Sequence, residues 1–512
     1  MKIFLICFAA GLASACGFAP LKLWPLTLLA VALLLWLVAE APRLRSALAR
    51  GWWFGVGHFT LGNNWIATAF TYQSEMPAWL GWIAVVLLSL YLAVYPAAAA
   101  GLAWRYGRTD ALRMTLVFAA AWIATEWLRA TMFTGFAWNP LGVSLLPTPV
   151  ARVAPWIGTY GLSGVAALLA GALLIVWSRR WPAAGILLGC IGAATGLAFL
   201  ASPAAPAAKG PALRIVQPNI GQQDKWREGF EEENMALLRR FSAGGAAPRL
   251  LLWPEAAVTR PLENGLTYPA AQEEVSYLRS EVASMLRPGD LLLTGGVTWQ
   301  SRTGLDVTSA TNSVFAMDRS GRILGRYDKA HLVPYGEYLP MRPILSAIGL
   351  SRLAPGDVDF DPGPGPQTLD LPLVGKVGFQ LCYEIIFSGE VVDRKNRPNV
   401  IFNPSNDAWF GAWGPPQHLA QARLRALEEG LPVLRSTPTG ISAVIDADGR
   451  LLISLPWRTP GAIDGRLPAP KPPTLFARFG NLLPFAFALL LVLAAALVAR
   501  RQRTIAETGE AR

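Results

Sequence analysis

The stretch "KVGFQLCYE", residues 376–384, runs from an apolar, strand-like segment directly into a cysteine and then into a glutamate. In α/β proteins, buried strands end where the chain turns at the edge of the sheet, and functional side chains gather there. Only four cysteines occur in the whole chain, so the position of Cys382 needs a reason. It is either a small buried hydrophobe or a reactive thiol.

The segment around this cysteine, residues 212–465, repeats the same pattern. Short apolar runs rich in β-branched residues end in turn residues or polar clusters. Helical stretches lie between these runs, around residues 231–241, 271–286 and 418–429. Strands buried on both faces, with helices between them, predict a layered α/β domain.

The rest of the chain has the composition of a membrane protein. Of the 512 residues, 53% are hydrophobic and 15% are charged. A helix needs about 20 mostly apolar residues to cross a bilayer. Seven such segments precede the α/β domain and an eighth follows it, at residues 3–19, 21–39, 51–72, 78–104, 112–128, 153–177, 181–201 and 475–499. These segments predict a seven-helix membrane domain over residues 1–201 and a C-terminal transmembrane helix at 475–499.

The first apolar segment contains "LASAC" at residues 12–16, which is similar to the cleavage site of a lipoprotein signal peptide. The leucine stands four residues before the cysteine rather than three, and six further spans follow before the α/β domain, so we expect an uncleaved first helix. Basic residues gather in the short loops on one side of the predicted membrane: Lys2, Arg43, Arg45, Arg50, Arg105, Arg108, Arg113, Arg179, Arg180, Arg500, Arg501 and Arg503. We expect this side, which includes both termini, to be cytoplasmic, and the α/β domain to lie on the opposite side. The same residues account for much of the net charge of +11, so no nucleic-acid partner is expected.

A catalytic thiol needs a base to remove its proton and a positive group to stabilise the oxyanion. His331 and His418 lie in the α/β domain, and either could form a Cys–His pair with Cys382. A carboxylate is an alternative base when its site is dry. Glu255 and Lys329 each follow another strand-like run, "LLLWPE" and "ILGRYDK". From these residues alone, both arrangements remain open.

Three motifs, "LLWPEAA" (251–257), "RYDKAHLVPYGEYLP" (326–340) and "GFQLCYE" (378–384), together resemble the nitrilase, or carbon-nitrogen hydrolase, superfamily. That resemblance implies an αββα sandwich with a Glu–Lys–Cys triad. With membrane segments on both sides, essentially the whole chain resembles the apolipoprotein N-acyltransferase family. The resemblance makes Glu255 the general base, Lys329 the oxyanion stabiliser and Cys382 the nucleophile.

The same resemblance points to further residues. Glu337 in "PYGEYLP" would be an assisting glutamate, and Trp226, Tyr383 and Glu384 would be important for activity. Simple packing is the alternative role for the two aromatic residues.

The resemblance also implies an activity. A phospholipid, such as phosphatidylethanolamine, would give its acyl chain to the cysteine as a thioester. The α-amino group of a diacylated apolipoprotein would then accept the chain. The enzyme would be a multi-pass monomer of the bacterial inner membrane with a periplasmic catalytic domain. We expect no cofactor and no metal, because the sequence has neither an HExxH nor a CxxC motif. Two other functions fit the same organisation: a membrane-tethered amidase of the superfamily, and a multispan transporter with an extracytoplasmic domain.

Overall fold

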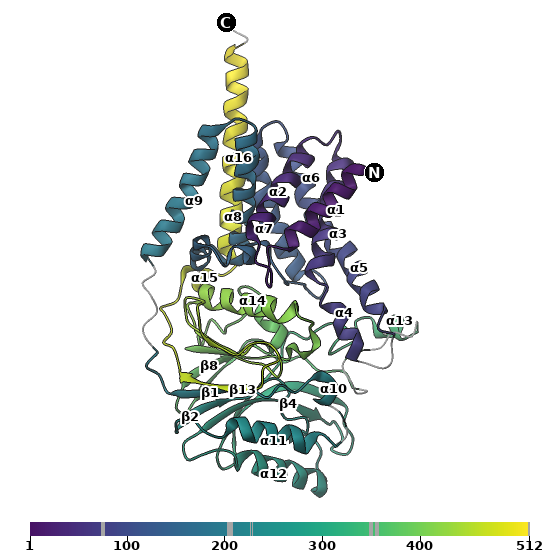
Figure 1. Cartoon of the computed structure of the whole chain (residues 1–512), viewed down its shortest axis with the longest axis vertical. Helices are drawn as coiled ribbons and strands as arrows, with labels where there is room; N and C mark the ends of the chain where they lie inside the picture. Colours follow the sequence, from purple (N-terminus) through teal and green to yellow (C-terminus); the bar gives the residue numbers. More distant parts are fainter. Residues whose placement is uncertain are drawn as a thin grey trace. The chain divides into compact units, whose positions relative to one another are not determined.

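The computed structural model describes residues 1–72, 77–201, 208–225, 227, 229–347, 352–353 and 358–509. The chain divides into two compact units, each described here by itself (Figure 1). The helical unit comprises Met1–Ala67, Gly81–Pro203 and Pro473–Arg512, and the sandwich unit comprises Thr68–Leu80 and Ala204–Pro472.

The helical unit contains a helix in each of the eight apolar segments. Its longer helices are α1 (Lys2–Ala15), α2 (Trp24–Ala39), α3 (Leu44–Gly62), α5 (Leu80–Leu92), α6 (Val94–Gly107), α7 (Ala111–Thr131), α8 (Ala154–Trp177), α9 (Trp181–Ala201) and α16 (Leu482–Gly509). Shorter pieces are α15 (Leu475–Phe479) and the 3₁₀ turns η2 (Leu141–Leu145) and η3 (Pro149–Val153). Helix α4 (Ile66–Ala69) begins in this unit and ends in the residues of the sandwich unit, to which η1 (Phe70–Tyr72) belongs.

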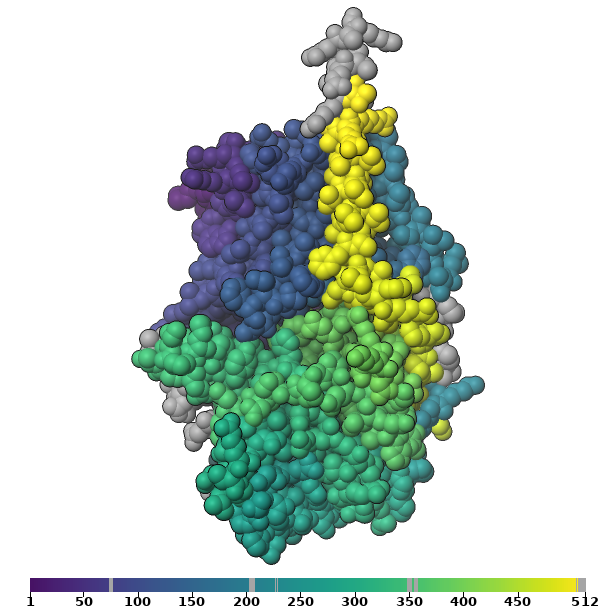
Figure 2. Space-filling view, turned by 180° about the vertical axis from the view of Figure 1, so that it is seen from behind, coloured from purple at the N-terminus to yellow at the C-terminus, as the bar shows by residue number. Residues whose placement is uncertain are grey.

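Among the described residues, five helices are long and apolar enough to cross a bilayer: Leu80–Gly107, Ala111–Thr131, Pro149–Trp177, Trp181–Ala201 and Leu482–Gln502. These helices identify a multi-pass membrane protein. In the space-filling view α16, in yellow, presents its side chains along the surface of the unit (Figure 2). Leu490 and Leu497 of this helix are 63% and 66% exposed, as expected for side chains that meet lipid.

Some helix ends differ from the sequence expectation. The third helix begins at Leu44 rather than near residue 51, because the basic segment before the apolar run is also helical. The last segment is broken at Gly480, whose φ of +55° ends α15 before α16 begins. Helices α1 and α3 pack closely, since a side chain at Gly57 would lie 2.1 Å from the Phe8 carbonyl oxygen.

The sandwich unit contains two sheets. The first has the order β13-β1-β2-β4-β5-β6, with β3 paired to β4, and the second has the order β12-β11-β10-β9-β8-β7. Strands of the first sheet are β1 (Ala212–Gln217), β2 (Arg249–Leu252), β3 (Glu263–Asn264), β4 (Leu291–Gln300), β5 (Ser309–Asp318), β6 (Ile323–Asp328) and β13 (Gly461–Arg466). Those of the second are β7 (Thr368–Leu371), β8 (Gly375–Phe379), β9 (Val400–Pro404), β10 (Val433–Ser436), β11 (Ala443–Ile445) and β12 (Leu451–Ser454). The central strands are parallel in both sheets: β1, β2 and β4 in the first, and β8, β9 and β10 in the second.

Four layers result from this arrangement. The two sheets face each other across an apolar core that includes Leu252 and Leu293 from one sheet and Phe379 and Phe402 from the other. Helices α11 (Glu231–Ser242) and α12 (Pro269–Ala283) pack on the outer face of the first sheet. Helix α14 (Gly414–Glu429) packs on β10 of the second sheet. Shorter helices are α10 (Gln222–Lys225), α13 (Arg342–Ala347), η4 (Cys382–Ile386) and η5 (Asp407–Trp409). The predicted αββα sandwich and its three helical stretches are confirmed (Figure 1).

Candidate active site

Cys382 lies just beyond the end of β8, where the chain turns into η4. The residue is buried, with 5% of its surface exposed. Its backbone has φ +51°, in the left-handed region that non-glycine residues avoid. Such a conformation costs about 1–3 kcal/mol and persists only where surrounding contacts hold it, as they often do at active sites.

Glu255 and Lys329 come from the other sheet and meet in the interior. Glu255 lies three residues after β2, and Lys329 directly follows β6. The Lys329 Nζ atom lies 3.7 Å from Oε1 of Glu255 and 2.9 Å from Oε1 and Oε2 of Glu337. All three side chains are buried. The structure therefore brings together three of the residues that the sequence singles out.

Asn312, on β5, completes this group although the sequence analysis did not single it out. Its Nδ2 atom donates to Oε1 of Glu255 and to Oε1 of Glu337, both at 2.8 Å. The backbone N–H of Val333 donates to Oε2 of Glu337 at 2.8 Å. Two carboxylates are thus held side by side by one amide and one ammonium group.

Burial and the charged groups around the thiol shift the pKa of Cys382 in both directions. Burial raises the pKa of Cys382 well above 9, the neighbouring Glu255 carboxylate raises it further, and Lys329 opposes them. Burial alone would lower the pKa of Lys329, but the carboxylates of Glu337 and Glu255 outweigh it and raise that pKa. The resting site therefore holds a neutral thiol beside a permanent cation, and the thiol needs a base before it can react.

Lys225 supplies a second ammonium group that the sequence analysis missed. This buried side chain donates from Nζ to the backbone oxygen of Glu255 at 2.9 Å. Burial lowers the pKa of Lys225 to about 8, against the opposing effect of Glu255 and Cys382. The neighbouring Trp226, which the resemblance singled out, lies outside the described residues.

Glu384 connects the loop after β6 with the loop after β8 from inside the protein. Its Oε1 atom accepts from the backbone N–H of Ala330 at 2.7 Å and of His331 at 3.0 Å, directly after Lys329. Its Oε2 atom accepts from the N–H of Leu381 at 2.7 Å, directly before the cysteine. The Tyr327 hydroxyl donates to both oxygens, at 2.8 and 2.9 Å. Burial raises the pKa of Glu384, and the hydrogen bonds to its carboxylate oppose that effect.

Tyr383 is also buried, and its ring packs against two aromatic neighbours. The ring centroid lies 5.8 Å from that of His331 and 5.2 Å from that of Phe387. His331 itself stacks on Phe387 at 3.8 Å. These contacts fit the packing role for Tyr383 that the sequence left open.

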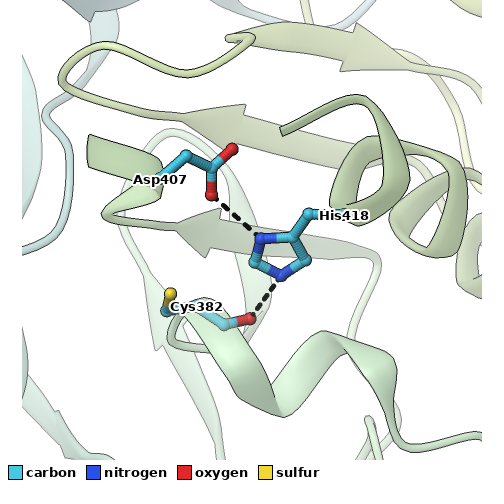
Figure 3. Close-up of side chains that lie close together, drawn as sticks. All are labelled: Cys382, Asp407 and His418. Atoms are coloured by element: carbon cyan, nitrogen blue, oxygen red, sulfur yellow. Dashed lines mark hydrogen bonds and ion pairs between the residues drawn. The ribbon is translucent and has the colours of Figure 1, made fainter. Parts of the chain in front are cut away.

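His418 lies beside Cys382 and contacts its backbone carbonyl rather than its thiol (Figure 3). The Nε2 atom is 3.0 Å from the carbonyl oxygen of Cys382, and Nδ1 is 2.9 Å from Oδ1 of Asp407. A carbonyl oxygen can only accept, so Nε2 carries the hydrogen. Burial and the guanidinium of Arg435 lower the pKa of His418. This geometry favours Glu255 over His418 as the base.

Thiol, imidazole and carboxylate ligands are typical of zinc sites, and the potential ligand atoms of Cys382, Asp407 and His418 lie within 4.8 Å of one another. The Asp407 oxygens, however, accept from Arg435 at 2.7 and 2.8 Å. A cation would have to displace that guanidinium and the hydrogen bond from His418 to the cysteine carbonyl. The expectation of a metal-free site stays a prediction.

Comparison with known proteins covers both units. A model of the apolipoprotein N-acyltransferase N-terminal domain matches residues 10–172, and a carbon-nitrogen hydrolase model matches residues 213–470. The apolipoprotein N-acyltransferase of Rhodopseudomonas palustris is 36% identical, over 97% of this chain and 95% of the relative. That of Bradyrhizobium diazoefficiens is also 36% identical, with the same coverage. A solved structure of a nitrilase-superfamily protein from Saccharomyces cerevisiae is 17% identical and covers 55% of this chain and 97% of its own, with a TM-score of 0.37.

Proposed function

This chain belongs to the apolipoprotein N-acyltransferase family, and from that premise we propose that it moves an acyl chain from a phospholipid to an apolipoprotein in two steps. The observation that carries the proposal is the meeting of Glu255 and Lys329 in one buried site that interacts with the Cys382 thiol. A base, a cation and a nucleophile are the three groups that acyl transfer through a thiol requires.

In the first step, Glu255 takes the proton of the thiol, and the sulfur attacks the ester carbonyl carbon of the phospholipid. Lys329 stabilises the negative charge that develops on the carbonyl oxygen. The tetrahedral intermediate then collapses and the ester C–O bond breaks. Glu255 returns the proton to the leaving oxygen, so a lysophospholipid departs and an acyl thioester remains on Cys382.

In the second step, the free α-amino group of a diacylglyceryl-cysteine attacks the thioester carbonyl. Glu255 accepts a proton from the attacking amine, the C–S bond breaks, and the proton returns to the sulfur. The products are an N-acylated lipoprotein and the free thiol. The site starts the next cycle in its original protonation state.

Burial of the site supports transfer to an amine over hydrolysis. Glu255, Lys329 and Cys382 are 6%, 1% and 5% exposed. A dry site protects a thioester from water and strengthens the interaction of Lys329 with an oxyanion. Glu337 keeps Lys329 in place, since its two oxygens each lie 2.9 Å from Nζ.

The substrates, the oligomeric state, the location of the enzyme and its domain bounds are part of the same proposal. Phosphatidylethanolamine is the proposed donor and a diacylated apolipoprotein the proposed acceptor. The protein is a monomer in the bacterial inner membrane, with the sandwich unit in the periplasm and both termini in the cytoplasm. The basic loops support this orientation. The functional domains are proposed at residues 1–201, 212–465 and 475–499.

An amidase of the same superfamily would transfer the acyl chain to water. The experiment supplies acyl-labelled phosphatidylethanolamine and a diacylated lipopeptide to the purified full-length protein. Label on the α-amino group of the peptide, lost in Cys382→Ala, is the expected result. Label released only as free fatty acid would identify a hydrolase and overturn the proposal.

A further inference from the structure

A buried polar network lies next to the proposed nucleophile and has no part in the two chemical steps. It consists of Asp407, His418 and Arg435, each with 0% exposure. His418 stands on α14, Asp407 begins η5, and Arg435 lies on β10. His418 is the member that reaches the cysteine, through the 3.0 Å contact between Nε2 and the Cys382 carbonyl oxygen (Figure 3).

The contacted carbonyl belongs to a strained residue. Cys382 has φ +51°, and a left-handed backbone at a residue with a Cβ atom costs about 1–3 kcal/mol. Without external contacts the turn would relax, and the direction of the thiol would change with it. A hydrogen bond to the carbonyl of the same residue opposes that relaxation directly.

The ring of His418 is itself held in a fixed orientation. Nδ1 lies 2.9 Å from Oδ1 of Asp407 and 3.0 Å from a guanidinium nitrogen of Arg435. Arg435 donates to both Asp407 oxygens, to Oγ of Ser405 at 2.9 Å, and to the side-chain oxygen of Asn403. The network thereby ties the parallel strands β9 and β10 to the backbone of the nucleophile.

We propose that His418 is a positioning residue, which holds the backbone of Cys382 in its left-handed conformation through the Nε2–H···O=C hydrogen bond. Arg435, which Asp407 holds in place, sets the angle of the ring by donating to Nδ1. This inference rests on the proposed role of Cys382 as the nucleophile. A rigid support of this kind matters because a displacement of about 1 Å in a reacting group can cost about 10²-fold in rate.

The role differs from that of a general base. A base must have an accepting nitrogen free to take the thiol proton, whereas Nε2 of His418 already carries a hydrogen that is used by the carbonyl. An amide N–H at the same position would make the same hydrogen bond to the Cys382 carbonyl as the imidazole does. A basic group is not required.

Two substitutions separate these roles. His418→Gln can place an amide N–H near the position of Nε2 but cannot act as a base. His418→Leu removes the hydrogen bond and keeps an apolar group of moderate size. Glu428→Gln is a matched control, because Glu428 is equally buried on the same helix and bonds to Ser388 and Arg425 instead.

The measurement is the single-turnover rate of acyl-thioester formation from phosphatidylethanolamine, together with the melting temperature of each full-length variant. We expect His418→Leu to acylate about 100-fold more slowly than wild type, while His418→Gln and Glu428→Gln stay within about 10-fold. Should the leucine variant unfold, His418→Asn replaces it, since its shorter amide does not reach the carbonyl. It should then be slower than His418→Gln.

Three results would overturn the inference. The first is wild-type acylation by His418→Leu, and the second is equal rates for the asparagine and glutamine variants. The third is a glutamine variant as slow as the leucine variant, which would indicate a base. If wild-type protein itself took up no acyl chain, the proposed function would fail, and the inference with it.

Discussion

Replacement of Glu384 by glutamine tests whether this residue braces the two catalytic loops. The amide has one accepting oxygen where the carboxylate has two. The glutamine amide can adopt two orientations. With its NH₂ group at the Oε1 position it would face two donors, the N–H groups of Ala330 and His331. The orientation of lower free energy therefore places the NH₂ group at the Oε2 position. There it opposes the N–H of Leu381, which now lies 2.7 Å from the carboxylate.

The loss is therefore at least one strong buried hydrogen bond, with its donor left unpaired. Such a loss costs about 1.5–3 kcal/mol. For a domain of this size, each kcal/mol lowers the melting temperature by about 2–4 °C, so Glu384→Gln should melt about 3–12 °C below wild type. Cys382 directly follows Leu381, whose N–H is left unpaired, so acylation should also fall by about 10²-fold.

Thermal unfolding of the purified protein, in parallel with intact-mass measurement of the acyl-enzyme, provides the assay. Glu390→Gln is the control, because it makes the same change at an exposed glutamate of the same segment. A Glu384→Gln variant that melts and reacts like this control would refute the bracing role. Normal melting with lost acylation would instead indicate that Glu384 contacts the substrate.

Further predictions concern the charges around the thiol. Alkylation of Cys382 by iodoacetamide, followed at its own peptide by mass spectrometry, should rise with pH to beyond pH 9, because burial and then Glu255 raise the pKa of the thiol. Burial lowers the pKa of Lys225 to about 8, so its amine is mostly neutral where the thiol titrates. Lys225→Met should therefore leave this profile near that of wild type, whereas Lys225→Arg, whose guanidinium stays charged, should shift it to lower pH. Coincident profiles of wild type and Lys225→Arg would contradict the assignment of Lys225 to the site. Asn312→Leu removes two 2.8 Å hydrogen bonds, to Glu255 and Glu337, and should slow acylation by about 10²-fold in the single-turnover assay. An unchanged rate would show that the two carboxylates keep their positions without Asn312. His331→Ala should form the thioester at a rate within about 10-fold of wild type. Complete loss of thioester formation would instead favour a Cys–His mechanism.

Part of the site could be predicted because its residues lie in three contiguous motifs that resemble those of a known family. Cys382, Glu255 and Lys329 each follow an apolar strand run, so the pattern of buried strands predicts where they stand. Glu337 was singled out by the family resemblance of the motif that also contains Lys329.

The remaining contacts join residues far apart in the chain. Asn312 and Glu255 are 57 positions apart, and Lys225 and Glu255 are 30 apart. Nothing local distinguishes such a lysine or asparagine from one at the surface, because burial and pairing depend on how the sheets stack. Asp407 and Arg435 are charged residues in the interior, which composition and periodicity do not predict.

The ends of helices in the helical unit could not be predicted from the sequence pattern either. Hydropathy marks the apolar part of a segment, whereas a helix continues as long as its backbone hydrogen bonds do. The third helix therefore extends to Leu44 through basic residues that a hydropathy pattern excludes.

The central claim is that Cys382 carries the acyl chain. Its most direct test is the intact mass of the full-length protein after incubation with phosphatidylethanolamine alone. We predict a mass increase of one acyl chain, mapped to Cys382, absent from Cys382→Ala, and discharged by a diacylated lipopeptide. An unmodified protein under conditions that do produce N-acylated peptide would contradict the account.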